Sequence, residues 1–137
     1  MTKHLGEFRV QSEELRIGIA ERSIEFAVRI IPMVNSIPKT PAGYAIASQI
    51  VRSGTSIGAN LQEAQSASSK KDFIHCVNIA LKEARETYYW LTLLSRSQLI
   101  PPKKLCLLLK ENDEIIRILV TIVKKSRNNS ALLTRNS

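Results

Sequence analysis

Long stretches of aliphatic residues at helical spacing constrain the fold of this chain more than any other feature. Over residues 12–36, apolar side chains recur at alternating steps of three and four, which is the repeat of one face of an α-helix. This first stripe consists of Ile17, Ala20, Ile24, Ala27, Ile31 and Val34. A second stripe beside it consists of Ile19, Phe26, Ile30, Met33 and Ile37. A helix with so much apolar circumference needs two neighbours, both in its own bundle or one of them in another subunit.

Three further segments show the same helical repeat, and short polar or Pro-containing links separate them. With the first segment, the helices are expected at residues 12–36, 41–66, 69–96 and 101–127, with frayed ends at 1–11 and 128–137. No segment shows the period of two that a strand requires. Pro32 either kinks the first helix or marks its boundary, because proline removes one backbone donor.

Capping residues support these helix starts. Ser12 is a suitable N-cap for the first helix, and Thr40 followed by Pro41 suits the start of the second. Ser69 and Asp72 form a pattern that resembles a capping box at the start of the third. Pro101 or Pro102 begins the fourth.

The expected fold is all-α, an antiparallel up-down-up-down four-helix bundle in one domain over residues 1–137. The length suits one core, and aromatic residues make up only 5% of the chain, so that core must be aliphatic. Because the first two helices carry more apolar surface than four helices can bury among themselves, we also expect a homo-oligomer.

The centre of the second helix is unusually small-sided. Gly54 and Gly58 each cost about 1 kcal/mol of helix propensity relative to Ala, and close approach of another helix is the simplest compensation. Asn60 and Glu63 lie near the inner face of this helix, so we expect them to bond to neighbouring helices or to a second subunit, with a ligand site as the alternative. On the third helix, the remaining members of the predicted polar network are Glu83, Arg85 and Glu86. Structural ion pairs with Lys82 and Arg85 are expected there, rather than paired catalytic carboxylates.

The chain carries 20 Lys and Arg against 12 Asp and Glu, a formal net charge of +8. Such a surface attracts polyanions, although charge alone does not separate DNA, RNA and acidic protein, and a solvated helix face is the simpler alternative. The candidate nucleic-acid-binding residues are Arg16, Arg22, Arg29, Arg52, Lys70, Lys71, Lys103, Lys104, Lys110, Lys124, Lys125 and Arg127.

Catalytic and metal chemistry find no support in the sequence. His75 directly precedes Cys76 on a helix, where adjacent side chains do not face each other, and His4 lies in the lead-in. Cys76 and Cys106 are expected to be buried thiols. No cofactor, metal or catalytic residue is therefore predicted. No signal peptide or membrane span is recognisable, so a cytoplasmic location is expected.

The stretch from Gln49 to Ala64, QIVRSGTSIGANLQEA, resembles the signature of the four-helix-bundle proteins encoded in intervening sequences of bacterial large-subunit ribosomal RNA genes. Lys71 to His75, KDFIH, and Ile79 to Thr87, IALKEARET, match the same family in order and spacing. The similarity spans about residues 30–123. Gly58 replaces the commoner Pro and Ala64 the commoner Gly, which implies a different bend between the first two helices.

This resemblance implies a homopentamer arranged as a ring-like barrel, often with a basic channel. It also relates the chain to the accessory subunit of diversity-generating retroelements, which binds nucleic acid and a reverse transcriptase. The first functional hypothesis is therefore a non-enzymatic scaffold, expected to be pentameric, that binds RNA or DNA, with RNA favoured, and does not read sequence. The second is a protein-interaction adaptor without nucleic-acid contact.

Overall fold

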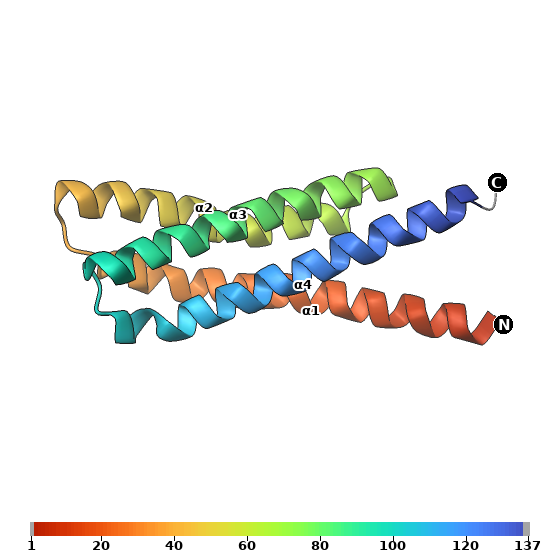
Figure 1. Cartoon of the computed structure of the whole chain (residues 1–137), viewed down its shortest axis with the longest axis horizontal. Coiled ribbons are helices and arrows are strands. Elements are labelled where there is room, and N and C mark those ends of the chain that lie inside the picture. The colour runs from red at the N-terminus through yellow and green to blue at the C-terminus, as the bar shows by residue number, and fades with distance from the viewer. Residues whose placement is uncertain (1, 136–137) are drawn as a thin grey trace.

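The computed structural model describes the backbone of residues 2–135 and the side chains of residues 16 and 18–129. It consists of four long helices: α1 (Thr2–Asn35), α2 (Pro41–Gln65), α3 (Lys70–Ser97) and α4 (Pro102–Arg135). The described residues include no strand, which confirms the predicted all-α class with four helices. In Figure 1 the helices lie alongside one another, and α1 and α4 reach beyond the connection between α2 and α3.

The outer helices are longer than the sequence pattern predicted. The predicted helix limits at residues 12 and 127 are too narrow, since α1 begins at Thr2 and α4 continues to Arg135. The expectation of frayed ends at residues 1, 136 and 137 lies outside the described residues. Neither end segment contains a proline, and extending an existing helix fixes one residue for each new hydrogen bond. Ser12 consequently lies inside α1 and does not cap it, and Pro32 is also inside this helix.

The caps of the two inner helices agree with the sequence. Thr40 is the N-cap of α2, and its hydroxyl accepts a hydrogen bond from the Gly43 amide at 3.1 Å. Ser69 likewise accepts from the Asp72 amide at the start of α3. The Asp72 carboxylate accepts from the Ser68 hydroxyl at 2.7 Å, and this contact further ties down the short link between α2 and α3.

The second of the two apolar stripes of α1 supplies most of the residues that this helix buries in the core. Ile19, Phe26, Ile30 and Ile37 are at most 5% exposed, and they pack with aliphatic residues from the other three helices. The buried residues of α2, α3 and α4 include Ile50, Ile57, Leu61, Val77, Leu91, Leu105, Ile115 and Leu119. The second stripe of α1 therefore makes most of its core contact. Of the first stripe, Ala20 is buried and Val34 packs against the core, Ile24 and Ile31 are exposed, and the side chain of Ile17 lies outside the described ones.

The outer sides of α1 and α2 carry large apolar side chains in contact with solvent. We call them the α1–α2 apolar face, and they are Ile24, Val28, Ile31, Tyr44 and Val51. Val28 and Tyr44 are each 62% exposed. Ile24, Val28 and Ile31 are spaced by four and three residues and so share one side of α1.

Small residues of α2 bring α1 close. Gly54 and Gly58 are both buried, and a Cβ added to Gly54 would lie 3.4 Å from the Ile30 side chain. A Cβ added to Gly58 would lie 3.6 Å from the backbone of Ser23. The backbone of α1 therefore approaches Gly58, whereas at Gly54 the neighbour is a side chain.

Of the four glycines whose surroundings are described, Gly43 has the least room for a larger residue. A Cβ there would lie 1.8 Å from the carbonyl oxygen of Pro38, whereas nothing lies within 4 Å of a Cβ at Gly18. We expect Gly43→Ala to lower the free energy of unfolding by about 1–3 kcal/mol, because the link before α2 must shift. Gly18→Ala should raise it by up to about 1 kcal/mol through helix propensity. Urea unfolding followed by circular dichroism measures both, and equal effects would contradict the assigned contact.

Candidate nucleic-acid interface

Arg22, one of the predicted nucleic-acid-binding residues, is engaged in an ion pair within the chain. Its Nε donates to Glu111 Oε1 at 2.8 Å and its Nη2 to Glu114 Oε2 at 2.5 Å, so it joins α1 to α4. Partial burial lowers the pKa of Arg22, but the hydrogen bonds and charges of Glu111 and Glu114 outweigh it and leave that pKa above its ordinary value. Arg22 therefore holds two helices together and has little capacity left for a phosphate.

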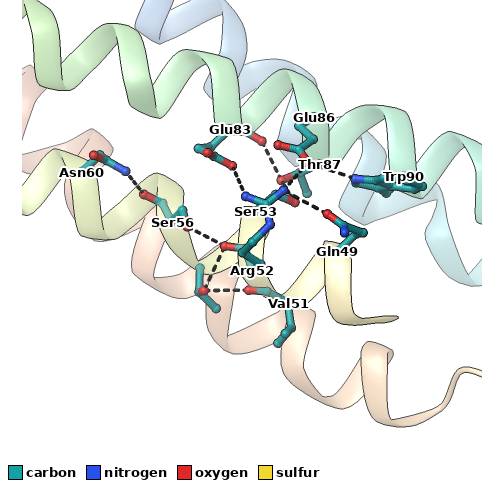
Figure 2. A network of polar contacts seen from close by, with 11 residues as sticks. Gln49, Val51, Arg52, Ser53, Ser56, Asn60, Glu83, Glu86, Thr87 and Trp90 are labelled. Atoms are coloured by element: carbon teal, nitrogen blue, oxygen red, sulfur yellow. Dashed lines mark hydrogen bonds and ion pairs between the residues drawn. The ribbon is translucent and has the colours of Figure 1, made fainter. Parts of the chain in front are cut away.

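Arg52, a second predicted contact, bridges α2 and α3. Its guanidinium donates to Glu83 Oε2 at 3.2 Å, to Gln49 Oε1 at 3.1 Å and to Glu86 Oε1. Figure 2 shows this group reaching from α2 toward both carboxylates of α3. Glu86 Oε1 also accepts from Trp90 Nε1 at 3.4 Å. Arg52 thus offsets part of the charge of two carboxylates and links α2 to α3.

The polar network continues into the core below Arg52. The hydroxyl of Thr87 hydrogen-bonds with that of Ser53 at 2.9 Å and with the carbonyl oxygen of Glu83 at 2.8 Å. Ser53 and Thr87 are both fully buried. Since buried hydroxyls need partners, this pair stabilises the contact between α2 and α3.

The ion pairs of Glu83 and Glu86 have a different partner from the predicted one. Glu83 and Glu86 do make ion pairs, but the partner is Arg52 and neither Lys82 nor Arg85. Arg85 is exposed, because its position on the helix turns it away from α2.

The two polar residues of α2 do not bond to another helix of this chain. Asn60 donates to the carbonyl oxygen of Ser56 within α2 at 2.8 Å, and Glu63 is exposed instead of facing the bundle interior. The expectation that they join neighbouring helices is therefore wrong within one chain. Contact with a second subunit stays a prediction.

Four cations form a line along α4. Lys103, Lys110, Arg117 and Lys124 follow one another at intervals of seven residues, and all four are exposed. Seven residues are nearly two helical turns, so the four share one side of α4 with about 10.5 Å between neighbours. Only Arg117 has an ion-pair partner among the described residues, Asp113 at 2.9 Å on the same helix. We call this set the α4 cationic line.

The outer side of α3 carries a second set of cations. Lys82, Arg85 and Arg96 are exposed and form no ion pair with a described residue. Glu83 and Glu86 of the same helix point instead to Arg52 on α2. The outward side of α3 is therefore positively charged.

The remaining predicted cations are spread over the surface. The Arg16 guanidinium lies 4.0 Å from the ring centroid of Phe73 and, with Lys70, borders a hollow of about 640 Å³ at the α2–α3 connection. Arg29 and Lys110 border a smaller hollow of about 320 Å³ together with Glu111 and Glu114. The others are exposed without an ion pair in the described part of the chain, namely Lys71, Lys104, Lys125 and Arg127.

The described residues contain no group of three or more His, Cys, Asp or Glu side chains that could hold a metal ion. Cys76 is half-buried, but Cys106 is exposed, so the expectation of a buried thiol is wrong for Cys106, which lies on the outward side of α4. His75 is exposed, and the side chain of His4 lies outside the described ones. None of the helices, as far as they are described, is long and apolar enough to cross a membrane.

Four long helices with an aliphatic core and no assembled catalytic group among the described side chains define an all-α protein of the four-helix class. The chain belongs to the 23S rRNA-intervening sequence protein family, whose model matches residues 16–121. This confirms the resemblance found in the sequence. The structure is also similar to the crystal structure of a protein of unknown function from the S23 ribosomal protein family of Bacteroides thetaiotaomicron. That similarity has 42% sequence identity and a TM-score of 0.75, over 80% of this chain and 98% of that chain. No curated protein matches.

Sequence reasoning missed Arg117, Lys82 and Arg96 as members of cationic surfaces. The seven-residue interval from Lys103 to Lys124 was a visible signal for Arg117. No sequence signal separated Arg22 and Arg52 from the other cations, because their carboxylate partners lie 31 to 92 residues away along the chain.

Replacing an engaged cation should affect stability more than replacing an exposed one. We expect Arg22→Gln to lower the free energy of unfolding by roughly 1 kcal/mol, since it leaves Glu111 and Glu114 without a counter-charge in a partly solvent-screened site. Lys110 is an exposed cation beside Glu111 on α4, and Lys110→Gln should change the free energy of unfolding by less than about 0.5 kcal/mol. Thermal unfolding at low salt measures the difference. Equal melting temperatures for the two variants would mean that the Arg22 ion pairs contribute nothing.

Proposed function

We propose that this protein is a non-enzymatic, cytoplasmic scaffold that assembles into a ring-like homo-oligomer, with five copies expected, of antiparallel up-down-up-down bundles. The assembly binds nucleic acid, RNA in particular, without reading its sequence. The observation that carries the proposal is the α4 cationic line, in which exposed positive charges recur at constant spacing along one helix.

The chemistry of the α4 cationic line suits a phosphate backbone. Lysine and arginine bind phosphate oxygens, and these contacts position a protein on nucleic acid but carry no base information. From Lys103 to Lys124 the line extends about 31 Å, enough to follow several nucleotides. The family description associates its members with 23S rRNA, and this favours RNA as the polyanion.

Self-association is supported by the α1–α2 apolar face. Its side chains lie on different helices from the α4 cationic line, so both surfaces can be occupied at once. Clustered exposed apolar residues mark protein contacts more often than isolated ones do. In a symmetric ring, each copy would repeat the cationic line, and a modest charge per chain would become a strong field.

An adaptor without nucleic-acid contact is the second candidate, and the same apolar face favours it. In that case the face would bind another protein, and the cations of α4 would only keep the chain soluble. The two candidates differ in one measurable property, the dependence of RNA binding on salt.

We expect the wild-type protein to bind a labelled RNA with an affinity that falls more than about tenfold between roughly 50 and 200 mM salt, because binding releases counterions. Lys110→Gln should weaken binding to RNAs of different sequence by a similar factor. It should also reduce the salt slope by about 1, because the variant has one cation fewer to bind a phosphate. Fluorescence anisotropy at several salt concentrations measures both quantities.

Lys39→Gln provides the matched control, since Lys39 is exposed in the link between α1 and α2, outside the α4 cationic line. It removes the same charge and should leave affinity within about twofold of the wild type. Absence of RNA binding at low salt would exclude the proposed function and leave the adaptor. Equal decreases in affinity for Lys39→Gln and Lys110→Gln would exclude the α4 cationic line as the binding surface.

A further inference from the structure

An exposed aromatic ring stands within the cationic side of α3. Tyr89 is 58% exposed, and its ring centroid lies 5.0 Å from that of Trp90, with an angle of 69° between the two planes. This edge contact supports the Tyr89 ring on one side and leaves much of the ring in solvent. Tyr88 is the other large apolar side chain exposed on the described part of α3. The exposed ring of Tyr89 is therefore suited to contact with another molecule.

The neighbour of Tyr89 is itself held in place. Trp90 Nε1 donates to Glu86, and Glu86 pairs with Arg52 of α2. Figure 2 shows this chain of contacts running from α2 to the indole of Trp90. The polar network between α2 and α3 thus fixes the ring that supports Tyr89, and pre-ordering a contact residue reduces the entropy lost on binding.

Cations flank Tyr89 at regular intervals. Lys82 precedes it by seven residues and Arg96 follows it by seven, so the three lie on one side of α3 at steps of about 10.5 Å. Arg85 lies one turn before Tyr89 and is also exposed. Arg52 pairs with Glu83 and Glu86, the two carboxylates nearest in sequence, and offsets part of their negative charge, so they repel phosphate less than free carboxylates would.

We propose that this side of α3 binds single-stranded nucleic acid, with one base stacked on Tyr89 and the flanking phosphates on Lys82, Arg85 and Arg96. This inference rests on the proposed function. It narrows the class of ligand from nucleic acid in general to single strands. Cations that alternate with aromatic rings are the arrangement that binds unpaired strands, because every base offers a π face. In a duplex the bases are stacked inside, out of reach of a ring on a straight helix.

The test compares wild type, Tyr89→Ala and Tyr89→Phe on a labelled oligouridine of about 20 nucleotides and on an RNA duplex of the same length, by anisotropy at one salt concentration. Tyr89→Ala should weaken binding of oligouridine at least about fivefold, and Tyr89→Phe, which keeps the ring, less than about twofold. Neither variant should change duplex binding by more than about twofold.

Trp90, the one tryptophan of the chain, supplies a second readout. Its fluorescence in the wild type should change on addition of oligouridine and stay constant with the duplex, since only an unpaired base reaches the ring beside it. Unchanged oligouridine binding by Tyr89→Ala, or an equal decrease in affinity for both probes, overturns the proposal.

Lys110→Gln separates this proposal from the general one. If Lys110→Gln lowers the affinity for both probes while Tyr89→Ala lowers the affinity for neither, that result supports phosphate-backbone binding on α4 and excludes the α3 site. If the wild type binds neither probe, both proposals fail.

Discussion

The packing of α1 against α2 is the contact on which the rest of the structure depends. Gly54 faces the side chain of Ile30 and Gly58 faces the backbone of Ser23, at distances where an added Cβ would make ordinary van der Waals contact. Ser53, beside Gly54 in the sequence, hydrogen-bonds to Thr87 on α3. One turn of α2 therefore contacts both α1 and α3. The side of α1 that enters the core carries Phe26 and Ile30, and the opposite side, with Val28, faces solvent.

This geometry divides the surface into parts with different chemistry. The cations near helix contacts, Arg22 and Arg52, are used to neutralise glutamates on the neighbouring helix. The cations on the outward sides of α3 and α4 have few acidic neighbours, so most of the positive charge accessible to a polyanion lies there. Five of the exposed large apolar side chains lie on α1 and α2, whereas Leu107 lies on α4 and Tyr88 and Tyr89 on α3. One chain thus presents exposed apolar residues on α1 and α2 and exposed cations on α3 and α4.

The helical repeat predicted the class of fold, the number of helices and the caps at Thr40 and Ser69, because these depend on contacts within a few residues. The ends of α1 and α4 were missed, since no proline or capping residue stops either helix and weak helix formers such as Asn128 are tolerated. The partners of Arg22 and Arg52 could not be predicted, because they depend on how helices distant in sequence are rotated against each other. Glu63 could not be predicted for the same reason. It lies at the edge of the buried stripe of α2, so the sequence did not decide whether its side chain faces the bundle interior or solvent.

We propose that the apolar residues exposed on α1 and α2 are shared between identical chains. Sedimentation equilibrium of the wild type beside Val28→Glu tests it most directly, because Val28 is 62% exposed and touches little within its own chain. Self-association predicts a wild-type mass that is a multiple of 15.4 kDa, with five copies expected, and a fall toward 15.4 kDa in Val28→Glu with helix content retained. A wild-type protein that stays at 15.4 kDa at concentrations of tens of micromolar, on the order of a moderate dimer affinity, would contradict it.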